Sequence, residues 1–366
     1  MANTFITPSI VAREALLILE NNLVATNLFN RGYQGEFQGA KVGDTITIRE
    51  PASFTANEFS STTSTQNITE ASTTLQLEKH FDITVGVTSK QFTLSLDDFR
   101  GRVIAPAMAG LAQAIDSYVL GKANQIANHV GTAGDPPDSL ADLVAIDKKL
   151  NDEKVPMAGR IAIMNPQAKA DIMANVTQVL QADQRGDGGE ALRRASLGEF
   201  LGMDFYMSQN IASHDTDGPA SWLVNSGSVA VGDTSVAIDG GSNNPKLGDI
   251  FTVAGDTTHY VVTAYSGGTL SFLPKAKVAW ADNSALTFET TDHAMNIAGH
   301  PAGLTVAIVP LDLPNGNETA EYVGDRGLGV RVVYDYNSST KTDTISFDVL
   351  CGAKVIQPEL LCRVKG

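Results

Sequence analysis

The segment that decides the fold runs from Leu94 to Val130 and reads LSLDDFRGRVIAPAMAGLAQAIDSYVLGKANQIANHV. Mostly apolar residues recur along it at spacings of three and four, which is the period of a helix with one buried face. The repeat comprises Ile104, Met108, Leu111, Ile115, Val119, Lys122 and Ile126. Alanines between them favour the helix and keep it slender. We therefore predict a long helix, about 39 Å over the part from Ala105 to Val130 at 1.5 Å per residue.

The predicted start of this helix carries its own signals. Ser95 and Asp98 form an S-x-x-D pattern like a capping box, and Asp97 adds negative charge at the positive end of the helix dipole. Pro106 either kinks the helix or marks a second start, because proline cannot continue the hydrogen-bond pattern of a helix interior.

The chain before this helix predicts a second helix and a long hairpin. Thr7 and Pro8 begin an amphipathic helix that reaches Phe29. A short strand follows at residues 45–50, and from Leu75 to Val87 the apolar residues keep one parity. Thirteen residues of strand span roughly 43 Å, which is long for one domain, so we expect this strand to extend beyond its own domain.

The chain after the long helix alternates between helices and strands. We predict a helix capped by Ser139, a buried strand at Arg160–Met164 and a helix from Asn165 to about Leu180. A polar loop, a helix at 190–200 and a strand near Phe205 complete this α/β stretch.

The composition changes at Ser226, and short alternating strands separated by Gly, Asn and Asp continue to Asp292. Such spacing is typical of a small β-barrel or sandwich, here an insertion. The tail then predicts a strand at Thr305–Val309 and a hairpin whose turn is Asn337–Asp343.

The overall composition excludes several classes of protein. A formal charge of −15 and a pI near 4.7 repel polyanions, so tight nucleic-acid binding is not expected. The two cysteines, Cys351 and Cys362, provide no disulfide framework. No signal-peptide pattern and no run of eighteen apolar residues occur, so we expect a cytoplasmic product without a membrane association.

Catalytic and metal-binding motifs are also missing from the sequence. The six histidines lack ligand spacing along the chain, and neither a G-x-S-x-G elbow nor a phosphate-binding G-x-x-x-x-G-K-[ST] loop occurs. We therefore predict no catalytic residue, no cofactor and no metal, and a protein that is not an enzyme.

Two short stretches and the order of elements resemble one family. Asp97-Asp98-Phe99-Arg100 looks like the Asp-Asp-Leu-Arg run that opens its spine helix, and residues 346–359, with Gly352 and Pro358-Glu359, are similar to its C-terminal strands. The chain thus resembles the major capsid proteins of tailed bacteriophages, with the Hong Kong ninety-seven fold, and most closely the podovirus-type coat proteins that carry an inserted domain.

The resemblance implies an α+β fold, the phage major-capsid fold, with a small inserted all-β domain. The implied parts are an N-terminal arm and helix (1–30), an extended β-hairpin loop (31–88), a peripheral domain with the spine helix (89–138), an axial domain (139–225), an inserted β-barrel-like domain (226–292) and a return to the axial and peripheral domains with C-terminal strands (293–366). The candidate residues for contacts between subunits are Phe54, Phe59, Lys79, Asp97, Asp98, Arg100 and Arg102.

The function implied is self-assembly into hexamers and pentamers of an icosahedral shell, first a procapsid and then a mature head. The expected partners are further copies, a scaffolding protein and a portal protein, around double-stranded DNA that is enclosed without sequence-specific binding. Assembly is expected in the bacterial cytoplasm. Two alternatives stay open: a nanocompartment shell of the same fold, and a β-rich surface or binding protein.

Overall fold

The computed structural model describes residues 8–33, 45–49, 58, 72–88, 103–177, 181, 197–225, 229–309, 311–313, 320–325, 328–337, 339 and 342–366. The chain forms two compact units. Unit 1 comprises Met1–Asn22, Arg31–Ala112 and Thr305–Ile356, and unit 2 comprises Leu23–Asn30, Gln113–Leu304 and Gln357–Gly366. No described helix is long and apolar enough to cross a membrane.

Unit 1 is built on an antiparallel sheet in which β19 is the central strand. One side of β19 pairs with β3, and the other side pairs with β18, which in turn pairs with β17. The strands are β3 (Lys79–Thr88), β16 (Leu304–Val309), β17 (Ala320–Asp325), β18 (Leu328–Asn337) and β19 (Thr342–Val355). The hairpin predicted for the tail is confirmed, since β18 and β19 pair across the polar turn between them.

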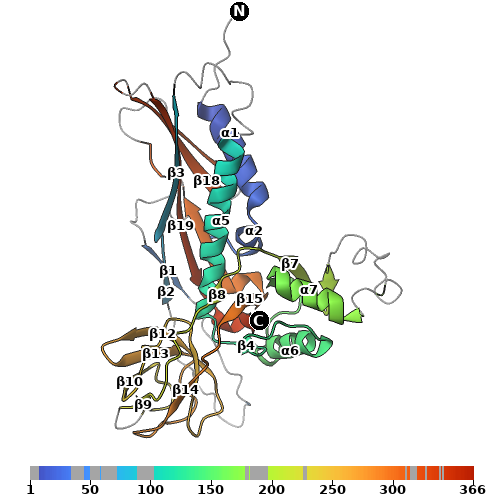
Figure 1. Cartoon of the computed structure of the whole chain (residues 1–366), viewed down its shortest axis with the longest axis vertical. Helices are drawn as coiled ribbons and strands as arrows, with labels where there is room; N and C mark the ends of the chain where they lie inside the picture. Colours follow the sequence, from blue (N-terminus) through green and yellow to red (C-terminus); the bar gives the residue numbers. More distant parts are fainter. Residues whose placement is uncertain are drawn as a thin grey trace, which may run out of the picture. The chain divides into compact units, whose positions relative to one another are not determined.

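One face of this sheet is apolar and carries helices (Figure 1). Phe347 and Val349 on β19 are fully buried, and exposure alternates along β3 with the predicted parity. The helix α1 (Pro8–Asn22) contacts β17 and β18, and its apolar residues, such as Leu19, are buried. The first half of α5 (Ala105–Gly121) lies against β3, where Gly110 faces the side chain of Ile83.

The single long strand predicted from Leu75 to Val87 is wrong, because two strands occupy this stretch. β2 (Ser72–Gln76) pairs with β1 (Thr45–Arg49), whereas β3 pairs with β19. The change of partner occurs where β2 passes Gly352 of β19. A Cβ atom at Gly352 would collide with the backbone carbonyl of Gln76, so only glycine permits this close crossing.

The N-terminal helix predicted to reach Phe29 ends earlier, at Asn22, and a short helix α2 (Ala25–Leu28) follows. In unit 2 the buried carboxylate of Asp116, on α5, accepts the backbone N–H groups of Val24, Ala25 and Thr26 at 2.8, 3.3 and 3.1 Å. It also accepts the hydroxyl of Thr26 at 2.9 Å. These N–H groups therefore bind a side chain and not the carbonyls of a continuing helix.

The long central helix is shorter than predicted. The α-helix spans Ala105–Gly121 and ends before a 3-10 turn, η3 (Lys122–Gln125). Residues 103–104 before it are π-helical and residues 94–102 lie outside the described residues, so the predicted start near Leu94 stays a prediction. Val130 lies in a strand, β4 (His129–Val130), which pairs in parallel with β20 (Leu361–Lys365). Backbone pairing with β20 therefore overrides the helical pattern at the end of this segment.

The first sheet of unit 2 has the strand order β4-β20-β15-β5-β7-β6, with β8 also paired to β15. β5 (Arg160–Met164) and β7 (Met203–Met207) confirm predicted strands, and β8 is Ser213–His214. β15 (His293–Gly299) and β20 lay outside the prediction. The helix predicted at 190–200 is wrong at its end, because Glu199–Phe200 is strand β6 and hydrogen-bonds β7.

Two helices accompany this sheet. α6 (Leu140–Asp152) begins at Ser139, whose hydroxyl and Asp142 form the capping box, which confirms the predicted start. α7 (Pro166–Asn175) begins as predicted after Asn165 but ends five residues before the expected Leu180. Buried residues of both helices share one core with the sheet, including Ile146, Ile172, Ala298 and Cys362.

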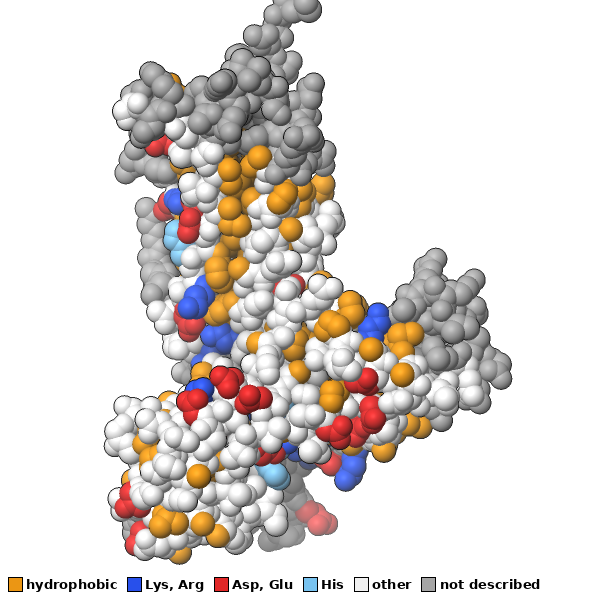
Figure 2. Space-filling model, viewed as in Figure 1, with side chains coloured by type: hydrophobic (Ala, Val, Ile, Leu, Met, Phe, Trp, Pro, Cys, Tyr) orange, Lys and Arg blue, Asp and Glu red, His pale blue; other side chains and the backbone are white. Residues whose placement is uncertain are grey.

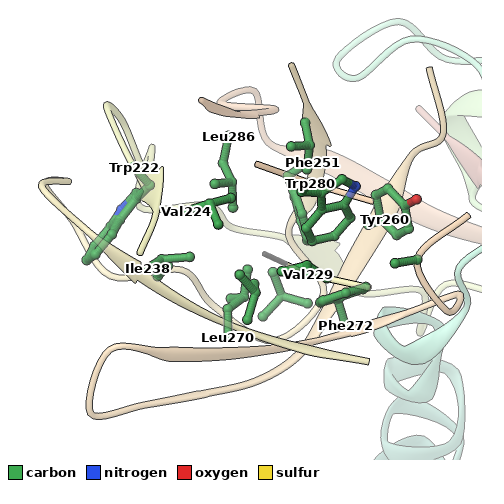
Figure 3. Packing of buried hydrophobic residues seen from close by; sticks show 14 of the residues in the cluster. Trp222, Val224, Val229, Ile238, Phe251, Tyr260, Leu270, Phe272, Trp280 and Leu286 are labelled. Carbon is green, nitrogen blue, oxygen red and sulfur yellow. The ribbon is translucent and has the colours of Figure 1, made fainter. Parts of the chain in front are cut away.

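The second sheet of unit 2 is antiparallel, with the order β14-β11-β12-β13-β10-β9. Its strands are β9 (Leu223–Val224), β10 (Ser235–Asp239), β11 (Ile250–Val253), β12 (Tyr260–Ser266), β13 (Thr269–Leu273) and β14 (Leu286–Phe288). Figure 3 shows its aromatic core, where Phe251, Tyr260, Phe272 and Trp280 pack edge to face or tilted. The strand predicted at 229–231 is only a bridge between Val229 and Trp280.

β9 precedes Ser226, so the second sheet includes a strand from before the predicted start of the insertion. The six domain limits given by the resemblance stay predictions.

Candidate assembly surfaces

The face of the unit 1 sheet opposite α1 carries a charged cluster. Register places Arg331 of β18 directly across from Asp348 of β19. The Nη2 and Nε atoms of Arg331 donate to Oδ2 of Asp348 at 2.7 and 3.1 Å, and Nη1 donates to the carbonyl of Asp312 at 2.7 Å. Paired guanidinium donors on one carboxylate make a strong, oriented ion pair.

Further polar side chains extend this cluster onto β3. The hydroxyl of Ser346 donates to Oδ1 of Asp348 at 3.0 Å, and Nε2 of His80 lies 3.7 Å from the same oxygen. Thr84 donates to Ser346 at 3.2 Å. Asp348 is only 5% exposed, so a nearly buried charge holds a polar face in one arrangement. Such a face can make specific hydrogen bonds with another polar surface without being apolar enough to aggregate.

The sequence-predicted contact residues are not brought together by the described part of the chain. Lys79 is exposed at the start of β3, across from Cys351. Its parity is that of Phe81, so it does not share the face of the charged cluster. The other six lie outside the described residues: Phe54, Phe59, Asp97, Asp98, Arg100 and Arg102. Their role in contacts between subunits stays a prediction.

Unit 2 has a second exposed surface, at the end of its first sheet where β5 begins. Met157, in the loop before β5, is 73% exposed, and Leu201, in the β6–β7 turn, is 38% exposed. Both line the rim of one shallow hollow together with Asp147, Arg160 and Glu199. Figure 2 shows further acidic side chains over the part of this unit where α6 lies. The hollow thus combines two exposed apolar side chains, Met157 and Leu201, with charged side chains that line it.

Arg160 makes the loop that carries Met157 rigid. It is 2% exposed, and it donates to the carbonyls of Pro156 and Val155 at 2.9 and 2.6 Å. It also donates to Asp147 at 2.8 Å and to Asn151 at 2.7 Å. A large exposed methionine on a loop held by so many hydrogen bonds is preorganised for contact, because little freedom is lost on binding.

Buried polar groups join the two sheets of unit 2. The side chain of Arg363 on β20 is fully buried, and both of its Nη atoms donate to the carbonyl of Gly248 at 3.0 Å. Burial lowers the pKa of Arg363 to about 10. Beside it, Nε2 of His214 lies 2.7 Å from Oδ1 of the buried Asp249. The orientation of the second sheet on the first is therefore determined by charged groups that water cannot replace.

The sequence held a signal for the first surface but not for the second. The predicted hairpin with its turn at 337–343 places Arg331 and Asp348 near each other on neighbouring strands. A register symmetric about that turn would pair Arg331 with Val349, and the observed register, shifted by one residue, pairs it with Asp348. Met157 carries no such signal, because its exposure depends on hydrogen bonds that Arg160 makes in three dimensions.

This chain resembles known proteins in structure but matches none of them in the sequence comparisons. No family model matches the sequence, and no curated protein matches it either. Among solved structures, a chain of Mycobacterium phage Che8 is 16% identical with a TM-score of 0.55, over 93% of this chain and 90% of that chain. The chain shares its α+β fold with this phage chain. The α+β fold class expected from the sequence is therefore confirmed.

Two further neighbours have lower scores. A chain from the asymmetric unit of the bacteriophage PhiM1 mature capsid is 10% identical with a TM-score of 0.49, over 89% of this chain and 82% of that chain. A chain from the capsid of Ralstonia phage GP4 is 9% identical with a TM-score of 0.49, over 89% and 84%.

Proposed function

We propose that this chain is the major capsid protein of a tailed bacteriophage, and that copies of it assemble into the icosahedral shell around the double-stranded DNA genome. The observation that carries the proposal is the fold, which is shared over almost the full length of both chains with the Che8 chain. The same fold was expected from the order of elements along the sequence, so two separate arguments support it.

The surfaces of the two units support self-assembly on physical grounds. Unit 1 presents a polar face ordered by the Arg331–Asp348 pair, and unit 2 presents Met157 on a rigid loop. Surfaces of this kind give contacts that are individually modest. Repeated around rings of identical subunits, such contacts add up, and closed rings can build a shell.

The charge of the chain supports enclosure of DNA without tight binding. At a formal charge of −15, the protein repels a polyanion instead of releasing its counterions. A shell wall of this kind confines DNA that must later leave. The finer parts of the proposal are assembly in the host cytoplasm, a scaffolding protein and a portal protein as partners, and no catalytic activity.

The direct experiment is expression of the full chain in bacteria, with and without a candidate scaffolding protein. Negative-stain microscopy and sedimentation velocity then measure the size of the product. The proposal expects closed, uniform shells in at least one of the two conditions. A uniform monomer in both conditions contradicts it.

The alternative of a nanocompartment shell differs in what the particles hold. Particles purified from infected cells are treated with nuclease and their contents are then extracted. Protected double-stranded DNA of genome length supports the capsid proposal, and an enclosed enzyme without DNA supports the alternative.

A further inference from the structure

A cluster of three potential metal ligands lies in unit 2, and the spacing of histidines along the sequence gives no sign of it. His129 is on β4, His259 precedes β12 and Glu289 follows β14. Their ligand atoms all lie within 4.8 Å of one another. Three separate chain segments therefore bring their ligand atoms to one point.

The two histidines are arranged as ligands require. Nδ1 of His129 lies 3.1 Å from the carbonyl of Ala127, so the proton on Nδ1 is donated and the lone pair of Nε2 is left available. A backbone carbonyl that orients a histidine in this way is the usual outer partner of a metal-bound imidazole. The ring of His259 meets that of His129 edge to face, with 4.8 Å between centroids.

Glu289 has one oxygen in use and one without a partner. Oε1 accepts from Nζ of Lys365 at 2.6 Å. Oε2 is buried and has no hydrogen-bond partner among the described residues. A buried carboxylate oxygen without a partner is costly, and a cation or donor beside it removes that cost.

We propose that His129, His259 and Glu289 bind a divalent transition-metal ion of the zinc class, with Oε2 as the carboxylate ligand. Two imidazoles and a carboxylate suit zinc better than calcium or magnesium, which take oxygen ligands. Zinc bonds of about 2.0–2.2 Å require the ligand atoms to draw closer by about 1 Å. A water molecule would take the fourth coordination position of the ion, and the adjoining hollow lined by Gly131, Thr290 and Thr291 has room for it.

Lys365 lowers the expected metal affinity of the site but leaves the Oε2 atom of Glu289 available to the ion. Its ammonium neutralises Glu289 through Oε1, on the other oxygen from the metal. The net positive charge after metal binding weakens the affinity compared with a site that lacks this lysine. The ion would join β4, in the first sheet, to the turns before β12 and after β14, in the second sheet.

The test uses the full chain after treatment with EDTA. Isothermal titration with zinc is expected to show one equivalent bound and a rise in Tm, because the ion binds only the folded chain. Cobalt is expected to give the visible absorption of a tetrahedral nitrogen and oxygen site, and magnesium is expected to leave the Tm unchanged.

Two variants and a control decide whether these residues are the ligands. His259→Ala changes an exposed side chain and is expected to lower the zinc affinity about tenfold or more while the metal-free Tm is kept. Glu289→Gln keeps the shape and is expected to give a similar loss. His80→Ala, an exposed histidine of unit 1, is expected to bind as the wild type does.

The inference is overturned if the wild-type chain binds no zinc, or if both His259→Ala and Glu289→Gln bind it unchanged. Equal loss in the His80→Ala control also overturns it. The capsid proposal is unaffected by these outcomes, since the measurements do not depend on assembly.

Discussion

At the scale of single residues, buried charges define the surfaces of this protein. Asp348 and Arg331 pair on the polar face of the unit 1 sheet, Arg160 fixes a loop, and Arg363 joins two sheets. Asp348, Arg331 and Arg160 lie on strands that the sequence predicts, whereas Arg363 lies on β20, which the sequence does not predict. The alternating pattern thus identifies the strands, but the partner of each charge depends on strand order, which periodicity does not encode.

Removing the carboxylate of Asp348 leaves Arg331 without its ion-pair partner. We expect Asp348→Ala to lower the free energy of unfolding by about 3 kcal/mol, which urea denaturation measures. Asp82→Ala on the same face is the control, because Asp82 is exposed, and it is expected to change stability by under about 0.5 kcal/mol. Equal effects of the two substitutions would show that the pair does not order this face.

Met157 is expected to act in assembly and not in folding. Because its side chain is 73% exposed, Met157→Glu should leave the urea midpoint of the soluble chain almost unchanged. A charge on an apolar contact surface should still prevent formation of shells, while Met157→Leu should assemble normally. If Met157→Glu forms normal shells, Met157 is not part of a contact between subunits. Electron microscopy of the products provides the measurement.

His293 predicts a dependence of stability on pH. Burial, and then the charge of Arg363, lower its pKa from 6.5 to about 4, and His214 and Glu289 are the other titratable groups near it. The unfolded chain therefore binds the extra proton between pH 6.5 and 4. Stability is full above pH 6.5 and decreases as the pH falls through this window, by up to about 3 kcal/mol.

The variant His293→Gln isolates this effect, because glutamine does not titrate. Its loss of unfolding free energy between pH 7 and pH 4 should be smaller than that of the wild type by up to about 3 kcal/mol. Urea melts at several pH values measure both chains. Identical pH profiles would mean that His293 does not titrate as described.

At the scale of elements, the helices and strands with strong local signals are where the sequence predicts them. Ser139 begins α6, Asn165 begins α7, and β5 coincides with its predicted range. The predicted elements are wrong where pairing with a strand distant in the sequence determines the local structure. The β2–β3 stretch changes partner where Gly352 permits a close backbone crossing, and pairing of β4 with β20 replaces the helical pattern before Val130.

Asp116 gives a test at this scale, since one side chain determines where α1 stops and α2 starts. Asp116→Ala removes the acceptor of three backbone N–H groups and a hydroxyl. We expect a loss of about 3 kcal/mol in unfolding free energy. Faster hydrogen exchange of residues 24–26 should accompany it. Asp152→Ala, at the exposed end of α6, should have little effect on either quantity.

Unchanged exchange at residues 24–26 in Asp116→Ala would contradict this account. It would mean that α2 forms without the carboxylate, and that the break after Asn22 has another cause.

At the scale of the whole molecule, the order of elements was predictable even though several boundaries were not. The sequence could not predict the metal-ligand cluster. More than a hundred residues separate His129 from His259, and the strands β12, β13 and β14 separate His259 from Glu289. It also could not predict the joint around Arg363, which requires β20 to lie beside a loop of the second sheet.

The central claim is that many copies of this chain build a closed shell. Cryo-electron microscopy of particles from cells that express the chain tests it most directly. We predict rings of five and six copies, each with the sheets and helices described for units 1 and 2. Only dispersed monomers, or particles whose density does not fit this fold, would contradict the account.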